Sequence, residues 1–420
     1  MIFFHILVLV NFACAAINYG TSSKERSMVK ESLKINKRSI NNKLPRNLRK
    51  LNKRSIFINY WTNWTSPIKY YVDNRLNVRR IMSVLKHISD HTCLEFEKVN
   101  NIIFTDQPLV YILEDYCAST TGKTRRYQIT TIDLTYACSD RFGAVAHETL
   151  HALGLSHEQQ RTDRDKYVKI HEENVPEEYK TDISDIDNST YFTFYNISYD
   201  YGSIMHYPTT SSVVGFKPLI TSRGNPLYNK MMGQSEGLSF NDFQLLNTYY
   251  CLSRCSHSIL KCKNGGYIDW RTCSRCICPS EYSGVDCNYV KPLFDSCSKT
   301  NLIAKNFYTL LNETGIKKCN YRIRSVNKKC IYISIYEVNT KEKEICSPRF
   351  GLEVKYLTDK GVTGLCLCGK YKSVNFISEN DEVYIEYHGL ESSNYFSLIY
   401  AECSDHKKES IVIEHNEDNF

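Results

Sequence analysis

Three histidines and a glutamate lie close together in the stretch AVAHETLHALGLSHEQQRTDR, residues 144–164. His147 and His151 are four residues apart, so on a helix their side chains lie on one face, one turn apart. Two imidazoles in this arrangement can bind one zinc ion. Glu148, beside the first histidine, can take a proton from a water molecule activated by the metal and pass it to a leaving amine. The stretch therefore predicts a hydrolytic zinc site.

A third ligand is expected at His157, six residues after His151. A straight helix would turn His157 away from the metal, but Gly154 lies between the two histidines. Glycine adopts a positive φ at little cost, which ends the helix and turns the chain back. Three protein ligands leave one position open for water, whereas a structural zinc site is closed by a fourth Cys or His. We therefore expect one catalytic Zn²⁺ per chain rather than ordinary surface or core histidines.

The segment YGSIMHYP, residues 201–208, adds a second motif. A lone methionine is more often a core residue, but Met205 in a turn after the extended zinc motif is the metzincin signature. Together the two motifs resemble the astacin family of zinc endopeptidases. Tyr207 matches the tyrosine that follows this family's Met-turn. The residues after the third histidine also match the family pattern: Glu158, Arg161, Asp163 and Arg164.

The resemblance implies a role for each of these residues. His147, His151 and His157 would be the zinc ligands, Glu148 the general base, and Tyr207 a fifth ligand that swings away to stabilise the oxyanion. It also implies a zinc cleft between two lobes, with substrate extended along an edge strand. The implied disulfides of this domain are Cys93–Cys251 and Cys117–Cys138.

Glu158 has a second implied position, near the new N-terminus that activation produces. The alternative is a solvated loop carboxylate. The start of the expected mature chain, SIFINYWTNW, does not closely match the usual family beginning, so the exact N-terminus stays open.

The elements that must position the site fall within residues 55–252, where strand-like and helical patterns alternate. SPIKYYVD and RYQITTIDLTYAC alternate as strands do, and RFGAVAHETLHALG carries the zinc motif on a helix. A further helix is predicted by apolar residues at helical spacing: Val78, Ile81, Met82, Leu85 and Ile88. The fold class expected here is a two-lobed α+β metzincin domain.

Two smaller domains are expected after this domain. Residues 253–288 hold six cysteines and resemble an EGF-like module, with the implied pairs Cys255–Cys273, Cys262–Cys276 and Cys278–Cys287. Residues 297–403 read as short strands of a β-sandwich and resemble a CUB domain, with the implied pairs Cys297–Cys319 and Cys346–Cys366. The pairing of Cys330, Cys368 and Cys403 is left open. Protease, EGF-like and CUB domains in this order resemble nematode astacins, and residues 404–420 read as a charged tail.

The first 54 residues are read as segments that are removed from the mature chain. Residues 1–16 have the apolar run and small-residue cleavage pattern of a secretory signal, rather than of a buried strand. Residues 17–54 carry twelve Lys or Arg and two Glu and end in a dibasic pair, which favours a propeptide over a solvated basic linker. This segment contains no aspartate, although astacin propeptides usually block the zinc with one. We expect latency to depend mainly on withholding the correct N-terminus.

Cysteine usage and charge limit where the chain acts and what it binds. Eighteen cysteines indicate an oxidising compartment and hence secretion. Without residues 17–54 the chain has 41 basic and 44 acidic residues, so nucleic acid is not an expected partner. No segment after the signal is long and apolar enough to span a membrane. Sequons for N-glycosylation begin at Asn63, Asn188, Asn196 and Asn312.

The function predicted is that of a secreted zinc endopeptidase acting on an extended protein or peptide substrate. A secreted binding or adhesion protein with an inert protease fold is the alternative, but Glu148 and all three histidines are present. The EGF-like and CUB modules are expected to position the enzyme on an extracellular partner. The substrate stays open, with Arg223 and Lys230 as candidates for a basic subsite or as solvated residues.

Overall fold

The computed structural model describes residues 54–57, 63–124, 128–177, 180–184, 192–210, 215, 217–291, 297 and 299–403. The predicted signal peptide, residues 17–53 of the predicted propeptide, the sequon at Asn188 and the C-terminal tail lie outside these residues. No helix in the described part of the chain has the length and hydrophobicity that crossing a bilayer requires. The predicted domain boundaries remain predictions.

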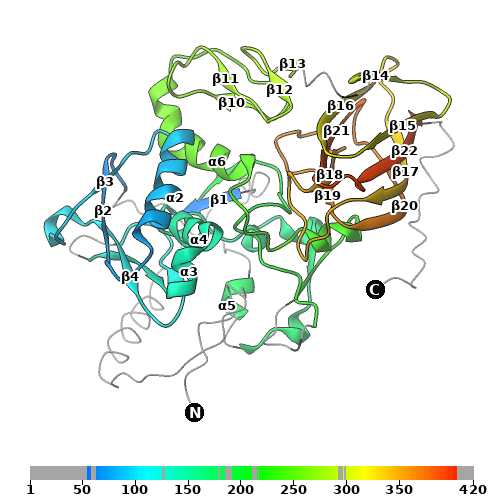
Figure 1. Cartoon of the computed structure of the whole chain (residues 1–420). Coiled ribbons are helices and arrows are strands. Elements are labelled where there is room, and N and C mark those ends of the chain that lie inside the picture. Colours follow the sequence, from blue (N-terminus) through cyan, green and yellow to red (C-terminus); the bar gives the residue numbers. More distant parts are fainter. Residues whose placement is uncertain are drawn as a thin grey trace, which may run out of the picture.

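The N-terminal lobe of the predicted catalytic domain is built on a five-stranded sheet with the order β3-β2-β4-β6-β5. Figure 1 shows β2, β3 and β4 of this sheet beside α2. Its strands are β2 (Ile68–Val72), β3 (Phe96–Lys98), β4 (Leu109–Leu113), β5 (Ala118–Ser119) and β6 (Thr130–Leu134). All neighbouring strands are parallel except β5, which pairs antiparallel with β6 at one edge. The helices of this lobe are α2 (Val78–His91), α3 (Tyr136–Asp140) and α4 (Phe142–Ala152).

Helix α2 forms where the apolar spacing predicts it, with one difference in its buried face. Asn77 caps the helix by accepting a hydrogen bond from the backbone N–H of Arg80. The buried side chains follow the i, i+3, i+4, i+7 pattern of one helix face: Ile81, Val84, Leu85 and Ile88. Met82, expected on this face, is 45% exposed because it lies one residue past the buried stripe.

The C-terminal lobe has less regular structure. Strands β7 (Val168–Ile170) and β9 (Ile220–Ser222) pair with each other, and β1 (Arg54–Phe57) pairs with β8 (Phe192–Tyr195). Its helices are α5 (Lys180–Ile183), α6 (Phe240–Leu246) and a π-helical turn Asn247–Cys251. The described part of the chain also has short 3₁₀ helices, which are Phe104–Asp106, Glu158–Gln160, Arg164–Lys166, Glu172–Asn174, Pro226–Lys230 and Leu252–Cys255.

Two disulfides hold the catalytic domain. Cys93, just after α2, is bonded to Cys251 at the end of the π-helical turn, which joins the first lobe to the end of the domain. Cys117–Cys138 ties the segment before β5 to α3. Both are pairs that the family resemblance implies.

A small disulfide-rich module follows the catalytic domain, as expected. It contains two short hairpins, which are β10 (Tyr267–Ile268) with β11 (Cys276–Ile277) and β12 (Tyr282–Ser283) with β13 (Tyr289–Val290). Its disulfides are Cys255–Cys273, Cys262–Cys276 and Cys278–Cys287. So few hydrophobic residues are buried here that covalent bonds must supply much of the stability.

The C-terminal domain is a β-sandwich, as expected. One sheet has the order β14-β16-β21-β18-β19 and the other β15-β22-β17-β20. The strands are β14 (Asn301–Ala304), β15 (Thr309–Thr314), β16 (Lys317–Ser325), β17 (Ile331–Asn339), β18 (Gly351–Lys355), β19 (Leu365–Leu367), β20 (Lys370–Ile377), β21 (Glu382–Gly389) and β22 (Tyr395–Glu402).

One predicted disulfide of the sandwich is wrong. Cys346 is bonded to Cys368 and not to Cys366, which is a buried free thiol. Cys366 lies within β19, and two residues along an extended chain span about 6.6 Å, so only one of the two cysteines can come within bonding reach of Cys346. Cys330 pairs with Cys403 and Cys297 with Cys319.

The EGF-like module and the sandwich meet through buried polar groups. Lys355 Nζ in β18 lies 2.8 Å from Glu281 Oε1, and the Glu281 side chain is fully buried. The Tyr282 hydroxyl donates a hydrogen bond to Glu382 Oε1 at 2.5 Å. Because an unpaired buried charge is costly, these contacts favour one arrangement of the two domains.

Candidate zinc site

Helix α4 carries the first two histidines of the motif. His147 and His151 are one turn apart on this helix, which ends at Ala152. Gly154 has a φ of 102°, and the Leu155 N–H closes the helix end with a 2.9 Å hydrogen bond to the Leu150 carbonyl. The chain therefore turns back at Gly154, as the sequence predicts, and returns His157 to the face of α4.

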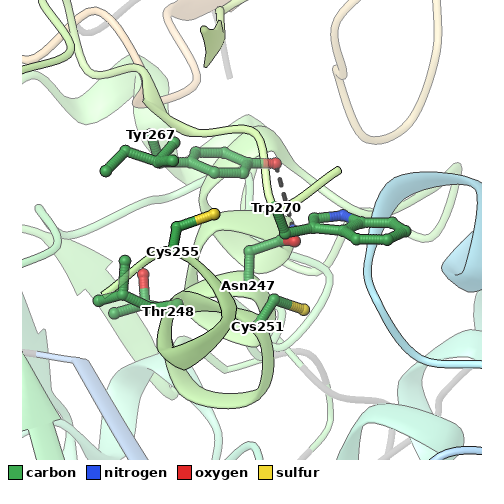
Figure 2. A pocket seen from close by; sticks show the side chains of 8 residues that line it. Asn247, Thr248, Cys251, Cys255, Tyr267 and Trp270 are labelled. Carbon is green, nitrogen blue, oxygen red and sulfur yellow. Dashed lines mark hydrogen bonds between the residues drawn. The ribbon is translucent and has the colours of Figure 1, made fainter. Parts of the chain in front are cut away.

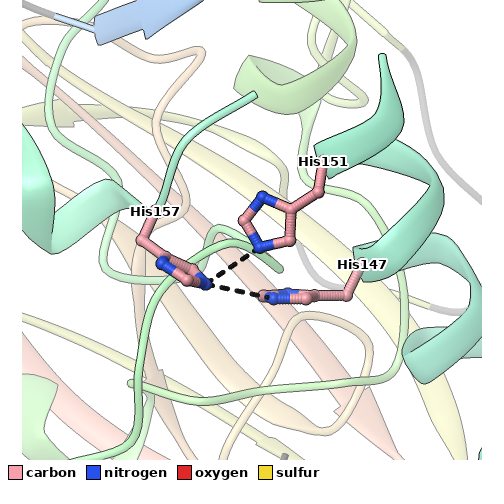
Figure 3. Close-up of side chains that lie close together, drawn as sticks. All are labelled: His147, His151 and His157. Atoms are coloured by element: carbon pink, nitrogen blue, oxygen red, sulfur yellow. Dashed lines mark hydrogen bonds between the residues drawn. The ribbon is translucent and has the colours of Figure 1, made fainter. Parts of the chain in front are cut away.

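The three imidazole rings converge on one point (Figure 3). His157 Nε2 lies 3.0 Å from His151 Nε2 and 3.3 Å from His147 Nε2. A tetrahedral zinc ion with Zn–N bonds of about 2.0–2.1 Å holds its nitrogen ligands about 3.3–3.4 Å apart. The two distances are equal to or slightly shorter than this separation, and the three ligand atoms lie within 4.8 Å of one another, so one zinc ion could bind all three.

The outer nitrogens of two rings fix their orientation. His147 Nδ1 lies 2.8 Å from the Ile204 carbonyl, and His151 Nδ1 lies 2.8 Å from the Leu155 carbonyl. Because a carbonyl only accepts, each Nδ1 carries the proton and leaves Nε2 as an electron-pair donor. Burial lowers the pKa of His147, and burial with the neighbouring histidine lowers the pKa of His151 to about 3. The rings are thus held in the neutral form that binds zinc.

Glu148 is buried on α4 next to the first ligand, with 2% of its surface exposed. Burial raises the pKa of its carboxyl to about 8, and the Asp133 carboxyl adds to the shift. A carboxyl with a pKa near neutrality is suited to accept and return a proton, and a nearby cation would favour its ionised form.

Hydrogen bonds tie the Met-turn to the loop that follows the third histidine and to α6. Met205 is fully buried in the core of the N-terminal lobe, and its carbonyl accepts a hydrogen bond from the Glu158 N–H at 2.9 Å. Asp242 accepts hydrogen bonds from the Ser203 hydroxyl at 2.6 Å and the Ile204 N–H at 3.2 Å. The Ile204 carbonyl orients His147, so Asp242 stabilises the orientation of this ligand by holding the backbone of Ile204. The zinc motif gave no indication of Asp242, which lies 38 residues away from Ile204.

Tyr207 is brought to the site by the same turn. Its ring centre lies 4.2 Å from that of His157, and its N–H donates to Gln159 Oε1 at 3.0 Å. His206 Nδ1 donates to the Tyr207 carbonyl at 2.8 Å, while His206 Nε2 accepts from the Tyr199 hydroxyl at 2.7 Å. The tyrosine expected near the metal therefore lies beside the third ligand, on a hydrogen-bonded backbone.

Glu158 is a buried ion-pair partner and not a solvated loop carboxylate. Its Oε1 accepts hydrogen bonds from Arg161 Nη1 at 2.8 Å and from the Asp200 N–H at 3.0 Å. The other side of the Arg161 guanidinium makes a bidentate pair with Asp163 at 2.8 and 2.9 Å. Ile56 forms a backbone bridge with Leu155, so the start of the expected mature chain runs beside the loop that carries Glu158.

Two side chains and one backbone N–H from distant parts of the chain fix the end of α4, and the sequence motif does not reveal them. Trp64 Nε1 donates to the Ala152 carbonyl at 2.8 Å, and the Tyr250 hydroxyl donates to the Leu153 carbonyl at 2.7 Å. The Gly122 N–H donates to the His151 carbonyl at 2.8 Å. These donors satisfy the carbonyls that every helix C-terminus leaves unpaired.

Arg223 and Lys230, the two candidates for a basic subsite, make different contacts. Arg223 Nε donates to the Val168 carbonyl at 3.1 Å, and Lys230 Nζ lies 5.8 Å from the centre of the Tyr371 ring in the sandwich. Lys230 therefore points to the neighbouring domain. The sequon residues Asn63, Asn196 and Asn312 are exposed, and their glycosylation remains a prediction.

A small hollow lies where the catalytic domain joins the EGF-like module (Figure 2). Its lining includes Asn247 and Tyr267, whose amide nitrogen and hydroxyl oxygen lie 3.5 Å apart. Cys251 and Cys255 also line it, and both are in disulfides. None of the residues around the zinc site lines this hollow.

The fold and the three-histidine cluster beside the buried carboxyl of Glu148 have the arrangement of a metzincin domain, in which three protein ligands would leave one position on a metal open. Residues 56–251 match the family model of the peptidase family named Astacin. Residues 56–251 therefore belong to the astacin family.

Relatives and one solved structure are similar to this chain. Zinc metalloproteinase nas-34 of Caenorhabditis elegans is 29% identical over 83% of this chain and 57% of its own length. Zinc metalloproteinase nas-37 of the same species is 33% identical over 78% of this chain and 41% of its own length. The chain thus spans about half the length of these relatives. High choriolytic enzyme 1 of Oryzias latipes, a hatching enzyme zinc-protease, matches 45% of this chain and 93% of its own with 27% identity and a TM-score of 0.39.

Proposed function

We propose that the chain is a secreted zinc-dependent endopeptidase that hydrolyses peptide bonds of extracellular proteins. The observation that carries the proposal is the convergence of His147, His151 and His157 beside the buried carboxyl of Glu148. When bound, zinc supplies a Lewis acid that lowers the pKa of water and polarises the scissile carbonyl. The three histidines would bind the ion. Backbone carbonyls orient His147 and His151, and the three imidazole rings pack against one another.

Glu148 moves the proton in this proposal. Its carboxylate takes a proton from the attacking water and then delivers it to the nitrogen of the leaving amine. Burial raises the pKa of Glu148 to about 8, and the positive charge of bound zinc would favour the carboxylate, so both forms are accessible near neutral pH. Tyr207, beside His157, donates a hydrogen bond from its hydroxyl to the oxyanion that forms on the former carbonyl.

The substrate is proposed to lie extended along β5. This strand is the antiparallel edge of the N-terminal sheet, so one side of its backbone can pair with a peptide. The segment after β5 contacts the zinc helix through the Gly122–His151 hydrogen bond, which places the strand next to the site. An extended substrate exposes its scissile bond, whereas a helix or a sheet hides it.

Secretion is supported by the disulfides. The described residues contain eight disulfide bonds and one free thiol, an arrangement that forms and persists in oxidising compartments. The EGF-like module and the sandwich are proposed to place the enzyme on an extracellular partner, since neither contributes a residue to the zinc cluster.

The test is the substitution Glu148→Gln in the full chain freed of its propeptide. The variant should keep one zinc ion per chain, measured by atomic absorption, because the three ligands are unchanged. Hydrolysis of a quenched fluorescent peptide library should fall at least ~100-fold, the lower range for a lost general base.

The matched control is Glu172→Gln, which removes an exposed carboxyl on the C-terminal lobe and should hydrolyse as the parent does. Hydrolysis by Glu148→Gln at the parental rate would exclude Glu148 as the base. A parent that binds zinc and cleaves no peptide would favour a binding protein with an inert protease fold.

A further inference from the structure

The C-terminal sandwich packs directly against the lobe that carries the Met-turn. Strands β18 and β19 lie on the side of the sandwich that faces the catalytic domain (Figure 1). The Cys346 N–H donates to the Lys230 carbonyl at 2.7 Å, and the Cys366 N–H lies 3.2 Å from Met231 Sδ. Met231 and Cys366 belong to one continuous apolar cluster that spans both domains. The two domains therefore share a core.

One contact of this interface falls on the backbone that leads into the Met-turn. A Cβ atom placed on Gly202 would lie 2.6 Å from Thr363 Cγ2 and 2.7 Å from both Thr363 Cβ and Oγ1. Real Cβ atoms do not approach other atoms so closely, so only glycine fits against this threonine. Thr363 lies just before β19 and is 5% exposed. The sandwich thus touches the main chain at Gly202.

Gly202 lies between two links to the zinc ligands. On one side, the Asp200 N–H donates to Glu158 Oε1 at 3.0 Å, next to the third ligand His157. On the other side, the Ile204 carbonyl accepts from Nδ1 of the first ligand, His147, at 2.8 Å. A displacement of Gly202 would therefore reach two of the three ligands.

Gly202 is also held by its own backbone groups. Its N–H donates to Asp200 Oδ1 at 3.0 Å, and its carbonyl accepts from Gln234 Nε2 at 2.8 Å. These two hydrogen bonds are made within the catalytic domain. The contact with Thr363 is the one that Gly202 makes with the sandwich.

We propose that Thr363 of the sandwich is a positioning residue for the zinc site, acting through Gly202 on the backbone that orients His147. This inference rests on the proposed function for its effect on catalysis. It makes the sandwich a part of the catalytic unit, and not only a module for binding partners. Residues that orient metal ligands without touching the metal typically change metal affinity or activity by about 10- to 100-fold when altered.

The test moves one methyl group across this contact in the full chain. Gly202→Ala should weaken zinc binding and lower kcat by roughly 10-fold or more while leaving KM nearly unchanged. Gly202 does not need a positive φ, so any loss comes from the collision with Thr363. Thr363→Gly alone should cause a smaller loss. The double variant Gly202→Ala with Thr363→Gly should recover most of the zinc affinity, because the added methyl refills the space.

Two controls separate this contact from general damage. Gly202→Ala with Thr363→Ser should not recover, because serine keeps the Cβ and Oγ atoms that collide. Gly237→Ala should behave as the parent, since a Cβ there meets nothing within 4 Å. Thermal unfolding of the zinc-free variants reports whether each one folds.

Zinc affinity is measured by competition with a chromogenic chelator, which needs no turnover. Two results would overturn the proposal. One is a double variant, Gly202→Ala with Thr363→Gly, whose loss of zinc affinity is the product of the two single losses. The other is a Gly202→Ala chain with parental zinc affinity. If the parent binds zinc and cleaves no peptide, the proposed function fails while the affinity series still decides the role of Thr363.

Discussion

At the scale of single residues, hydrogen bonds hold the main chain of Tyr207 beside the metal ligands. Gln159 accepts from its N–H and His206 donates to its carbonyl, so the backbone is fixed at both groups. The aromatic ring lies against His157. A side chain on a fixed backbone can change rotamer while the turn stays in place, which suits a group that approaches an oxyanion only during the reaction.

The substitution Tyr207→Phe tests this role. It removes the hydroxyl and keeps the ring packed against His157, so stability and zinc content should change little. Loss of one oxyanion donor typically lowers kcat by about 10²- to 10³-fold, and KM should stay within a few-fold. Steady-state kinetics on a single peptide measures both values. An unchanged kcat would contradict the assignment of Tyr207.

The residues of the zinc cluster could be predicted because their spacing is local. His147 and His151 share a helix face, and Gly154 marks the point where the chain must turn. The groups that hold them in place could not be predicted in this way. Trp64 and Asp242 reach the site from separations of 88 and 38 residues to their partners, and nothing in a short motif constrains such distances.

At the scale of elements, a buried carboxylate on β21 links neighbouring strands of the sandwich. Glu386 lies within hydrogen-bond distance of Lys318 Nζ, 2.8 Å away on β16, and also bonds with His388. Burial pushes the pKa of Glu386 up, but the hydrogen bonds from His388 and Lys318 outweigh burial and lower the pKa to about 2. The ionised carboxylate therefore stabilises the folded sandwich.

This lowered pKa predicts how stability depends on pH. The ordinary value is 4.5, so the contribution of Glu386 is fully present above pH 4.5 and is lost as the pH falls toward 2. Glu386→Gln should unfold at a lower temperature than the parent at pH 6, by calorimetry, and the difference should shrink at pH 3.

Glu391→Gln, which changes an exposed carboxyl in the same domain, should track the parent at both pH values. A temperature difference between Glu386→Gln and the parent that stays constant on acidification would show that Glu386 is not ionised by these partners.

Strand positions explain why one disulfide was predicted wrongly. Cys366 and Cys368 are two residues apart, and both fit the usual spacing for a bond to Cys346 in sequence. The choice between them depends on where β19 ends and on which residue faces Met231 of the catalytic domain. These features depend on how the two domains pack, and the spacing of cysteines in the sequence does not determine them.

At the scale of the whole molecule, the order of the three domains could be predicted, but their packing could not. Motifs describe each domain by itself, whereas the shared core around Met231 and Cys366 forms only when the domains meet. The free thiol is a direct probe of this interface, because Cys366 is 1% exposed and burial raises its pKa.

A thiol titration tests this packing. With Ellman's reagent, the native full chain without residues 1–16 should show no reactive thiol within minutes, because a buried protonated thiol is a poor nucleophile. The same chain in guanidinium chloride without reductant should show one, and the variant Cys366→Ala none. Rapid labelling of the native chain would show that the two domains separate in solution.

The bond between Cys93 and Cys251 closes a covalent ring of chain that contains all three zinc ligands, Glu148 and Tyr207. When a peptide bond is cleaved in a chain without such a disulfide, the two fragments can separate. A single cut inside this ring releases nothing, because both new ends stay attached through the sulfur bridge. Nicked molecules should therefore migrate as one species on a non-reducing gel and as two after reduction.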